Sequence, residues 1–201
     1  MRRASILAVV LAFVAFQAWW FQRQTATETR LERVASGIAG HPVDVYCPSL
    51  WKRLLDVSSF KGEAYLDANG EGTHATLAHD VCATFAELPE RGFPDLECLE
   101  RGDTVCDGWR LDVALAVHVL AHESWHLAGV TDESITECYA VQTDARVARE
   151  FGASPTAAEQ LAAFHLERGP TASLPQYRIS TDCSPATRLD LAPATDAWPS
   201  G

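Results

Sequence analysis

The chain begins with an almost unbroken apolar run over Ala4–Phe21, which Arg2 and Arg3 precede. About 20 apolar residues span a bilayer as a helix, and a positive flank stays on the cytoplasmic side. The pattern predicts a signal-anchor transmembrane helix over residues 1–21. This single-pass helix would hold the protein in the cell membrane with the rest of the chain outside the cytoplasm. Secretion after signal cleavage is the alternative, although the run lacks the small residues that a cleavage site requires.

Residues 22–40 are polar and mixed in charge, without a large apolar face, and this pattern predicts a stalk. A domain is expected over residues 41–201. Its first segments alternate between apolar and polar positions, as half-buried strands do. The predicted strands are Val43–Tyr46, Glu63–Leu66 and Thr73–Leu77, of which the last two form a hairpin.

The second half of the domain has helical patterns. Trp109–Ala128 is apolar on every side of a helix, and such a helix is buried. Gly129 ends it as a left-handed cap would, and Thr131 or Asp132 caps the next helix, which runs to about Phe151. These patterns predict an α+β fold, with a short sheet followed by three helices. Pro155–Arg168 is the third of these helices. Two further short helices are predicted earlier in the domain, Leu50–Val57 and Asp80–Leu88, and Pro89 closes the second.

Composition restricts the compartment and the partners. The formal net charge is −11, and an acidic surface repels phosphate backbones, so nucleic acid is not expected as a partner. All six cysteines follow the apolar run, and an even number of cysteines is typical of disulfides in an oxidising compartment. Cys98 and Cys106 are close enough in sequence to predict a local disulfide around a Gly-Asp turn signal.

Three ionisable side chains, His122, Glu123 and His126, interrupt the predicted buried helix. Residues four apart lie on one helix face, about 5–6 Å from each other, so the two histidines can offer imidazoles to one metal ion. Glu123 lies where its carboxylate can reach a water held by that metal. This H-E-x-x-H arrangement is the signature of zinc peptidases, and it predicts Zn²⁺ as the cofactor and Glu123 as the catalytic residue.

The stretch Val117–Ala148 resembles the zincin metallopeptidases, because H-E-S-W-H is followed by an acidic helix. Zincins take a third protein ligand from beyond the second histidine. Asp132 lies where the metzincins place theirs, but that group also has a methionine turn, and the only methionine in this chain is Met1. The resemblance is therefore to the gluzincins, which take a glutamate from the next helix.

Two glutamates fit gluzincin patterns. D-E-S-I-T-E resembles the thermolysin-like pattern, which implies Glu133, whereas E-C-Y-A resembles an E-x-x-A pattern, which implies Glu137. In a tight antiparallel hairpin, a metal beside residue 124 lies level with about residue 136 of the second helix. Side chains lean toward the N-terminus of a helix, so the ligand should lie slightly beyond that level. The geometry favours Glu137 as the third ligand, with Glu133 as the alternative.

The resemblance implies a membrane-anchored, extracytoplasmic zinc metallopeptidase that acts on a peptide or protein substrate. Glu123 would take the proton of the attacking water. In zincins a strand beside the metal helix often binds the peptide by β-addition, and Thr73–Leu77 is the expected edge strand. A non-catalytic zincin-like binding or structural domain of the cell envelope is the alternative. The candidates for oxyanion stabilisation are Tyr177, Tyr139 and His165. His118 is expected to line the cleft or support a ligand, and a plain core histidine is the alternative.

Overall fold

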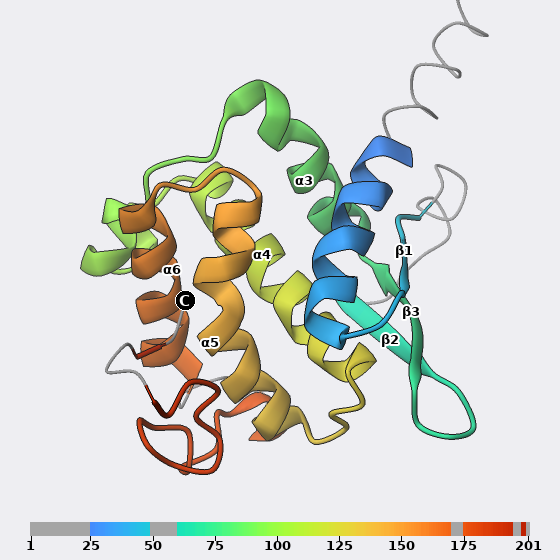
Figure 1. Ribbon diagram of the computed structural model, residues 1–201. Coiled ribbons are helices and arrows are strands. Elements are labelled where there is room, and N and C mark those ends of the chain that lie inside the picture. The colour runs from blue at the N-terminus through green and yellow to red at the C-terminus, as the bar shows by residue number, and fades with distance from the viewer. Residues whose placement is uncertain (1–24, 49–59, 170–174, 195–197, 200–201) are drawn as a thin grey trace, which may run out of the picture.

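The computed structural model describes residues 25–48, 60–169, 175–194 and 198–199, which form an α+β fold (Figure 1). The predicted anchor at residues 1–21 and the predicted helix Leu50–Val57 lie outside these ranges. Within the described part of the chain, no helix combines the length and apolar character that crossing a bilayer would need.

Three strands form one small sheet, in the order β1-β3-β2. They are β1 (Asp44–Tyr46), β2 (Gly62–Leu66) and β3 (Gly72–Leu77), which confirms the three predicted strands. β3 pairs antiparallel with β2 across the hairpin and parallel with β1 on its other side. The expectation that Thr73–Leu77 is an edge strand is therefore wrong. β3 is the central strand, and β1 and β2 are the edge strands among the described residues.

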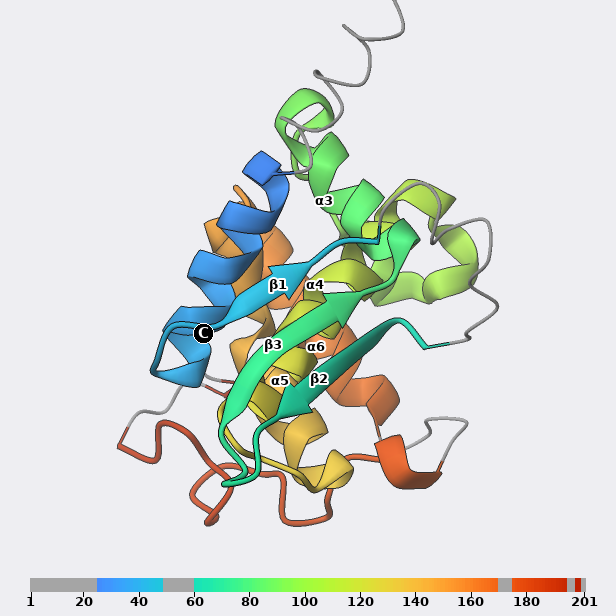
Figure 2. The ribbon, with the colours of Figure 1, turned by 90° about the vertical axis from the view of Figure 1, so that its right-hand side faces the viewer.

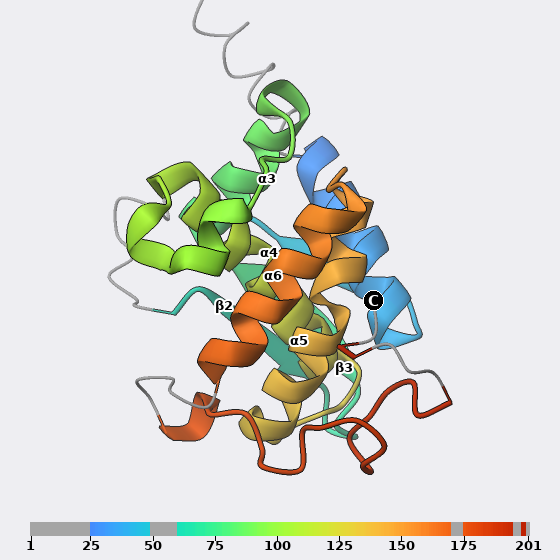
Figure 3. The ribbon, with the colours of Figure 1, turned by 90° about the vertical axis from the view of Figure 1, so that its left-hand side faces the viewer.

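The sheet lies against the central helix α4 (Gly108–Leu127), as Figure 2 shows. Strand residues alternate between faces, so Val45, Ala75 and Leu77 point inward and are almost fully buried. α4 is apolar around most of its circumference, because α5 (Glu133–Glu150) packs along the side away from the sheet and α6 (Pro155–Arg168) packs against α5 (Figure 3). The result is three layers with α4 in the middle one.

The boundaries of the helices follow their capping residues. Asp107, Asp132 and Ser154 each accept a hydrogen bond from a backbone N–H of the first turn of α4, α5 and α6. α3 (His79–Arg91) continues through Pro89, which was expected to close it. The connection from α3 to α4 contains the 3₁₀ segments Glu97–Arg101 and Asp103–Val105.

Residues 25–39 form a further helix, which differs from the predicted stalk. Its residues Leu31, Val34, Ala35 and Ile38 are buried in the main core. They have the i, i+3, i+4, i+7 spacing of one helix face, so the sequence carried a narrow apolar stripe that the polar composition obscured. This segment is therefore part of the folded domain.

Three disulfides join all the described cysteines: Cys47–Cys82, Cys98–Cys106 and Cys138–Cys183. The first connects the end of β1 to α3, and the second closes the short loop predicted from the sequence. The third ties the segment after α6 to α5. Such pairing is compatible with an extracellular protein.

One testable consequence concerns Gly72, at the start of β3. A Cβ added there would overlap the backbone of Leu127 at the end of α4, and backbone atoms cannot move aside as a side chain can. We expect Gly72→Ala to destabilise the fold by about 1–3 kcal/mol. Gly108→Ala is the control, because nothing lies within 4 Å of its Cβ position. Equal denaturation midpoints for the two variants would contradict the close strand–helix contact.

Candidate metal centre

Two histidines of α4 and one glutamate of α5 point their donor atoms at a common centre. Nε2 of His122 lies 3.0 Å from Nε2 of His126. Oε2 of Glu133 lies 3.1 Å from the first nitrogen and 3.3 Å from the second. These three atoms form a nearly equilateral triangle, and the side chains of both histidines are largely buried.

The triangle has the size that a metal ion needs. A tetrahedral cation with bonds of about 2.0–2.1 Å holds its ligand atoms roughly 3.3–3.4 Å apart. The Nδ1–H of His126 donates to the carbonyl oxygen of Val130 at 2.6 Å, so the Nε2 of a neutral ring presents its lone pair to the centre. Two nitrogen lone pairs facing each other repel unless a cation or a proton lies between them. His122, His126 and Glu133 could therefore hold a metal ion.

Glu137, the favoured third ligand from the sequence, lies elsewhere. Its Oε1 is 3.4 Å from Nδ1 of His122, on the opposite edge of the ring from the triangle. Its Oε2 is 2.8 Å from Nε2 of His118. Asp132, the metzincin-like candidate, caps α5 by accepting the N–H of Ile135 at 3.0 Å.

The register between α4 and α5 explains the difference. Glu133 lies level with the midpoint of His122 and His126, and Glu137 lies one turn deeper, level with His118 and His122. The expected hairpin was symmetric, with α5 continuing directly from the turn. Instead the connection between the two helices folds back over the His126 ring. Glu133, the first residue of α5, therefore lies about one turn before the C-terminal end of α4, measured along the axis of α4.

The carboxylates around the triangle determine the protonation state of His122. Burial disfavours the imidazolium form of His122, but hydrogen bonds to Glu133 and Glu137 outweigh it and raise the pKa of His122 to about 9. The hydrogen bond to His122 is the main cause that lowers the pKa of Glu133. The site therefore attracts positive charge, whether as a proton or as a metal ion.

Glu123 lies between α4 and the edge strand β2. A Cβ on Gly62 would come within 2.6 Å of the Glu123 side chain, so the carboxylate keeps its present position only because this residue is glycine. The backbone N–H of Ala64 donates to the same carboxylate. Burial raises the pKa of Glu123 to about 7, where the group can accept and release a proton near neutrality.

Tyr177 is the one aromatic candidate that lies at the centre. It ends the 3₁₀ segment η4 (Pro175–Tyr177), and its ring centroid is 5.8 Å from that of His122. Burial, followed by the charges of Glu133, Glu123 and Glu137, raises the pKa of Tyr177, so its hydroxyl stays protonated. Tyr139 instead packs on Trp125, whose Nε1–H donates to Thr143.

A disulfide and a small second core hold the segment that carries Tyr177. The backbone N–H of Ser180 donates to the carbonyl of Ser134, near the start of α5. The Cys138–Cys183 disulfide attaches the same segment one residue after Glu137. Cys138, Val141, Ile179 and Leu189 form a buried cluster there, separate from the main core.

A second group of ionisable side chains lies deeper on α4. Nδ1 of His118 is 3.0 Å from Oδ2 of Asp144, and Nδ1 of His165 is 2.7 Å from the same oxygen. Sequence reasoning identified His118 and His165 but missed Asp144. The sequence did carry a signal for Asp144. It follows Glu137 by seven residues, so the two acids lie on the same face of α5.

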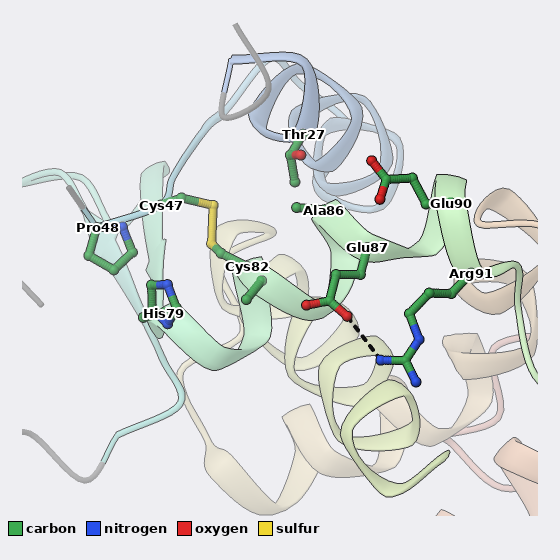
Figure 4. A pocket seen from close by; sticks show the side chains of 10 residues that line it. Thr27, Cys47, Pro48, His79, Cys82, Ala86, Glu87, Glu90 and Arg91 are labelled. Carbon is green, nitrogen blue, oxygen red and sulfur yellow. Dashed lines mark hydrogen bonds and ion pairs between the residues drawn. A yellow bond between two sulfur atoms is a disulfide. The ribbon is translucent and has the colours of Figure 1, made fainter. Parts of the chain in front are cut away.

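The structure also contains an apolar cavity of about 300 Å³ between α3 and the helix at residues 25–39. Figure 4 shows the Cys47–Cys82 disulfide and the Glu87–Arg91 ion pair at its wall. None of the residues of the candidate metal centre lines this cavity.

Comparison with known proteins gave no match to any family model, curated protein or solved structure.

A metal-binding experiment distinguishes Glu133 from Glu137 as the third ligand. We expect Glu133→Gln to weaken Zn²⁺ binding by far more than 100-fold, because it removes a donor atom of the triangle. Glu137→Gln should weaken binding by about 10–100-fold, because it only releases the far edge of the His122 ring. Competition against a chelator of known affinity would measure both. The opposite order would restore Glu137 as the third ligand.

Proposed function

We propose that the protein is a zinc-dependent metallopeptidase of the gluzincin type, anchored in the membrane with its domain outside the cytoplasm. The observation that carries the proposal is the N–N–O triangle of His122, His126 and Glu133, together with a Glu123 carboxylate close enough to interact electrostatically with His122 and Glu133. Two imidazoles and one carboxylate, with space for a fourth ligand, are the donor set of catalytic zinc sites. The three disulfides and the apolar run at residues 4–21 support the location.

A zinc ion bound there would polarise a substrate carbonyl group and lower the pKa of water toward neutrality. Glu123 would accept the proton of the attacking water and pass it to the leaving amine, since its pKa of about 7 suits both steps. The Ala64 N–H holds the Glu123 carboxylate in place. Tyr177, whose hydroxyl stays protonated beside His122, is the side chain suited to donate to the developing oxyanion.

The edge strand β2 supports a peptide as the substrate. Among the described residues, no strand pairs with the outer edge of β2, so an extended chain can add to its backbone groups there. Gly62 and Ala64 of this strand also contact Glu123. In Figure 2 the open edge of β2 faces the side on which α6 and η4 lie. A peptide paired with β2 would pass beside the metal centre.

The decisive variant is Glu123→Gln. We expect it to bind one Zn²⁺ per chain with wild-type affinity, because Glu123 is not a member of the triangle. Cleavage of any peptide that the wild type cuts should fall by about 10²–10⁴-fold, because the proton acceptor is lost. The assay is mass spectrometry of a diverse peptide library incubated with the full-length protein.

Three control variants complete this experiment. Glu159→Gln alters an exposed glutamate on α6, away from the site, and this variant should cleave as the wild type does. His122→Ala and His126→Ala should both lose tight Zn²⁺ binding. Tight zinc binding by the wild type together with no cleavage of any library peptide would favour the non-catalytic binding domain.

Gly62→Ala tests the position of Glu123 without changing its chemistry. The added methyl group would displace the Glu123 carboxylate, and a shift of about 1 Å at a reacting group can cost on the order of 10²-fold in rate. We expect lower cleavage with unchanged Zn²⁺ affinity. Gly108→Ala is again the matched control. Full activity of Gly62→Ala would show that Glu123 does not act from its position under β2.

A further inference from the structure

An unbroken series of contacts leads from the candidate metal centre into the helical layer. Nδ1 of His122 faces Oε1 of Glu137 at 3.4 Å, and Oε2 of Glu137 meets Nε2 of His118 at 2.8 Å. Nδ1 of His118 lies 3.0 Å from Oδ2 of Asp144, which lies 2.7 Å from Nδ1 of His165. Imidazoles and carboxylates alternate along the series, and they come from α4, α5 and α6.

The geometry determines the charge on His118. Both of its ring nitrogens face carboxylate oxygens, which only accept hydrogen bonds, so both nitrogens carry protons. Burial opposes this charge, but Asp144 and Glu137 together keep the pKa of His118 well above its usual value. The attraction of His118 in turn keeps the pKa of both carboxylates low despite their burial.

His165 is the second imidazole that contacts Asp144. Its own burial and the positive charge of His118 lower the pKa of His165, so the ring is neutral and its Nδ1–H donates to Asp144. The side chain of Asp144 is 0% exposed, and a buried carboxylate requires such donors. Asp144 therefore holds His118 and is itself held by His165.

We propose that His118 and Asp144 are positioning residues for the metal ligand His122. Asp144 orients His118, and His118 holds Glu137 so that its second oxygen stays at the Nδ1 edge of the His122 ring. Glu137 then keeps the Nε2 lone pair of His122 aimed at the centre, as carboxylates behind metal-binding histidines do. The inference rests on the proposed metallopeptidase site, since it requires a metal at the triangle.

The same side chains suggest a competing arrangement. Donor atoms of His118, Asp144 and His165 lie within 4.8 Å of one another, which is close enough for a second metal ion. However, Asp144 Oδ2 is at hydrogen-bond distance from both rings, and a His118 that is protonated on both nitrogens has no lone pair for a metal. The contacts therefore favour a hydrogen-bonded support over a second metal centre.

The test compares Asp144→Asn and the double variant His118→Gln/Asp144→Asn with the wild type, all as full-length protein. The double variant removes one positive and one negative charge, so the net buried charge stays the same and the variant can fold if the single variant does not. Thr143→Val is the matched control, because Thr143 is buried on the same helix but contacts Trp125 instead of the series. The readouts are metal content per chain, Zn²⁺ affinity by chelator competition and the visible spectrum of the Co²⁺-substituted protein.

We expect both Asp144 variants to bind one Zn²⁺ about 10–100-fold more weakly than the wild type, with altered Co²⁺ bands. Thr143→Val should lose stability without a change in either metal readout. Unchanged affinity and unchanged Co²⁺ bands in the Asp144 variants would overturn the inference, as would a wild type with two metal ions of which Asp144→Asn loses one. A wild type that binds no zinc would overturn the proposed function as well, so the two failures are distinct.

Discussion

The burial of α4 between the sheet and two helices is the constraint on which the rest of the structure depends. A helix in this position is expected to be apolar throughout, yet it carries His118, His122 and Glu123 in its middle turns. Each of these groups loses its hydration and must recover the lost energy from a charged or hydrogen-bonding partner. Their partners on α5, α6 and β2 therefore follow from the location of α4.

α5 supplies most of these partners from one face. Glu133, Glu137 and Asp144 point toward α4, while the other side of the helix holds Cys138 and Val141 in the small core under the C-terminal segment. The helix thus connects the charged interior to the segment that carries Tyr177. The Cys138–Cys183 disulfide strengthens this connection directly behind the charged face.

The β2–β3 hairpin contributes through two glycines as much as through its backbone groups. Gly62 and Gly72 let the hairpin approach α4 so closely that a methyl group at either position would meet Glu123 or the backbone of Leu127. This contact removes water from Glu123 and raises its pKa, while the adjacent Ala64 N–H keeps the carboxylate oriented. Sheet packing and the electrostatics of the proposed base are therefore consequences of the same close approach.

The sequence by itself determined the features that depend on local pattern. The α+β order, the strands near 44–77, the helices near 108–127, 133–150 and 155–168 and the pairing of Cys98 with Cys106 all follow from periodicity, capping residues or short separation. So does the placement of His122, Glu123 and His126 on one helix. The stripe at Leu31–Ile38 was also readable but was hidden by the polar residues around it.

Only the tertiary structure decided which distant groups meet. A change of one helical turn in the register between α4 and α5 exchanges Glu133 for Glu137 at the triangle, and the sequence of a hairpin does not specify how its connection folds back. The order of the strands, which made β2 the edge, depends on where β1 adds. The role of Asp144 depends on three helices packing together, because a carboxylate acquires its charge partners and its pKa from neighbours that are remote in sequence.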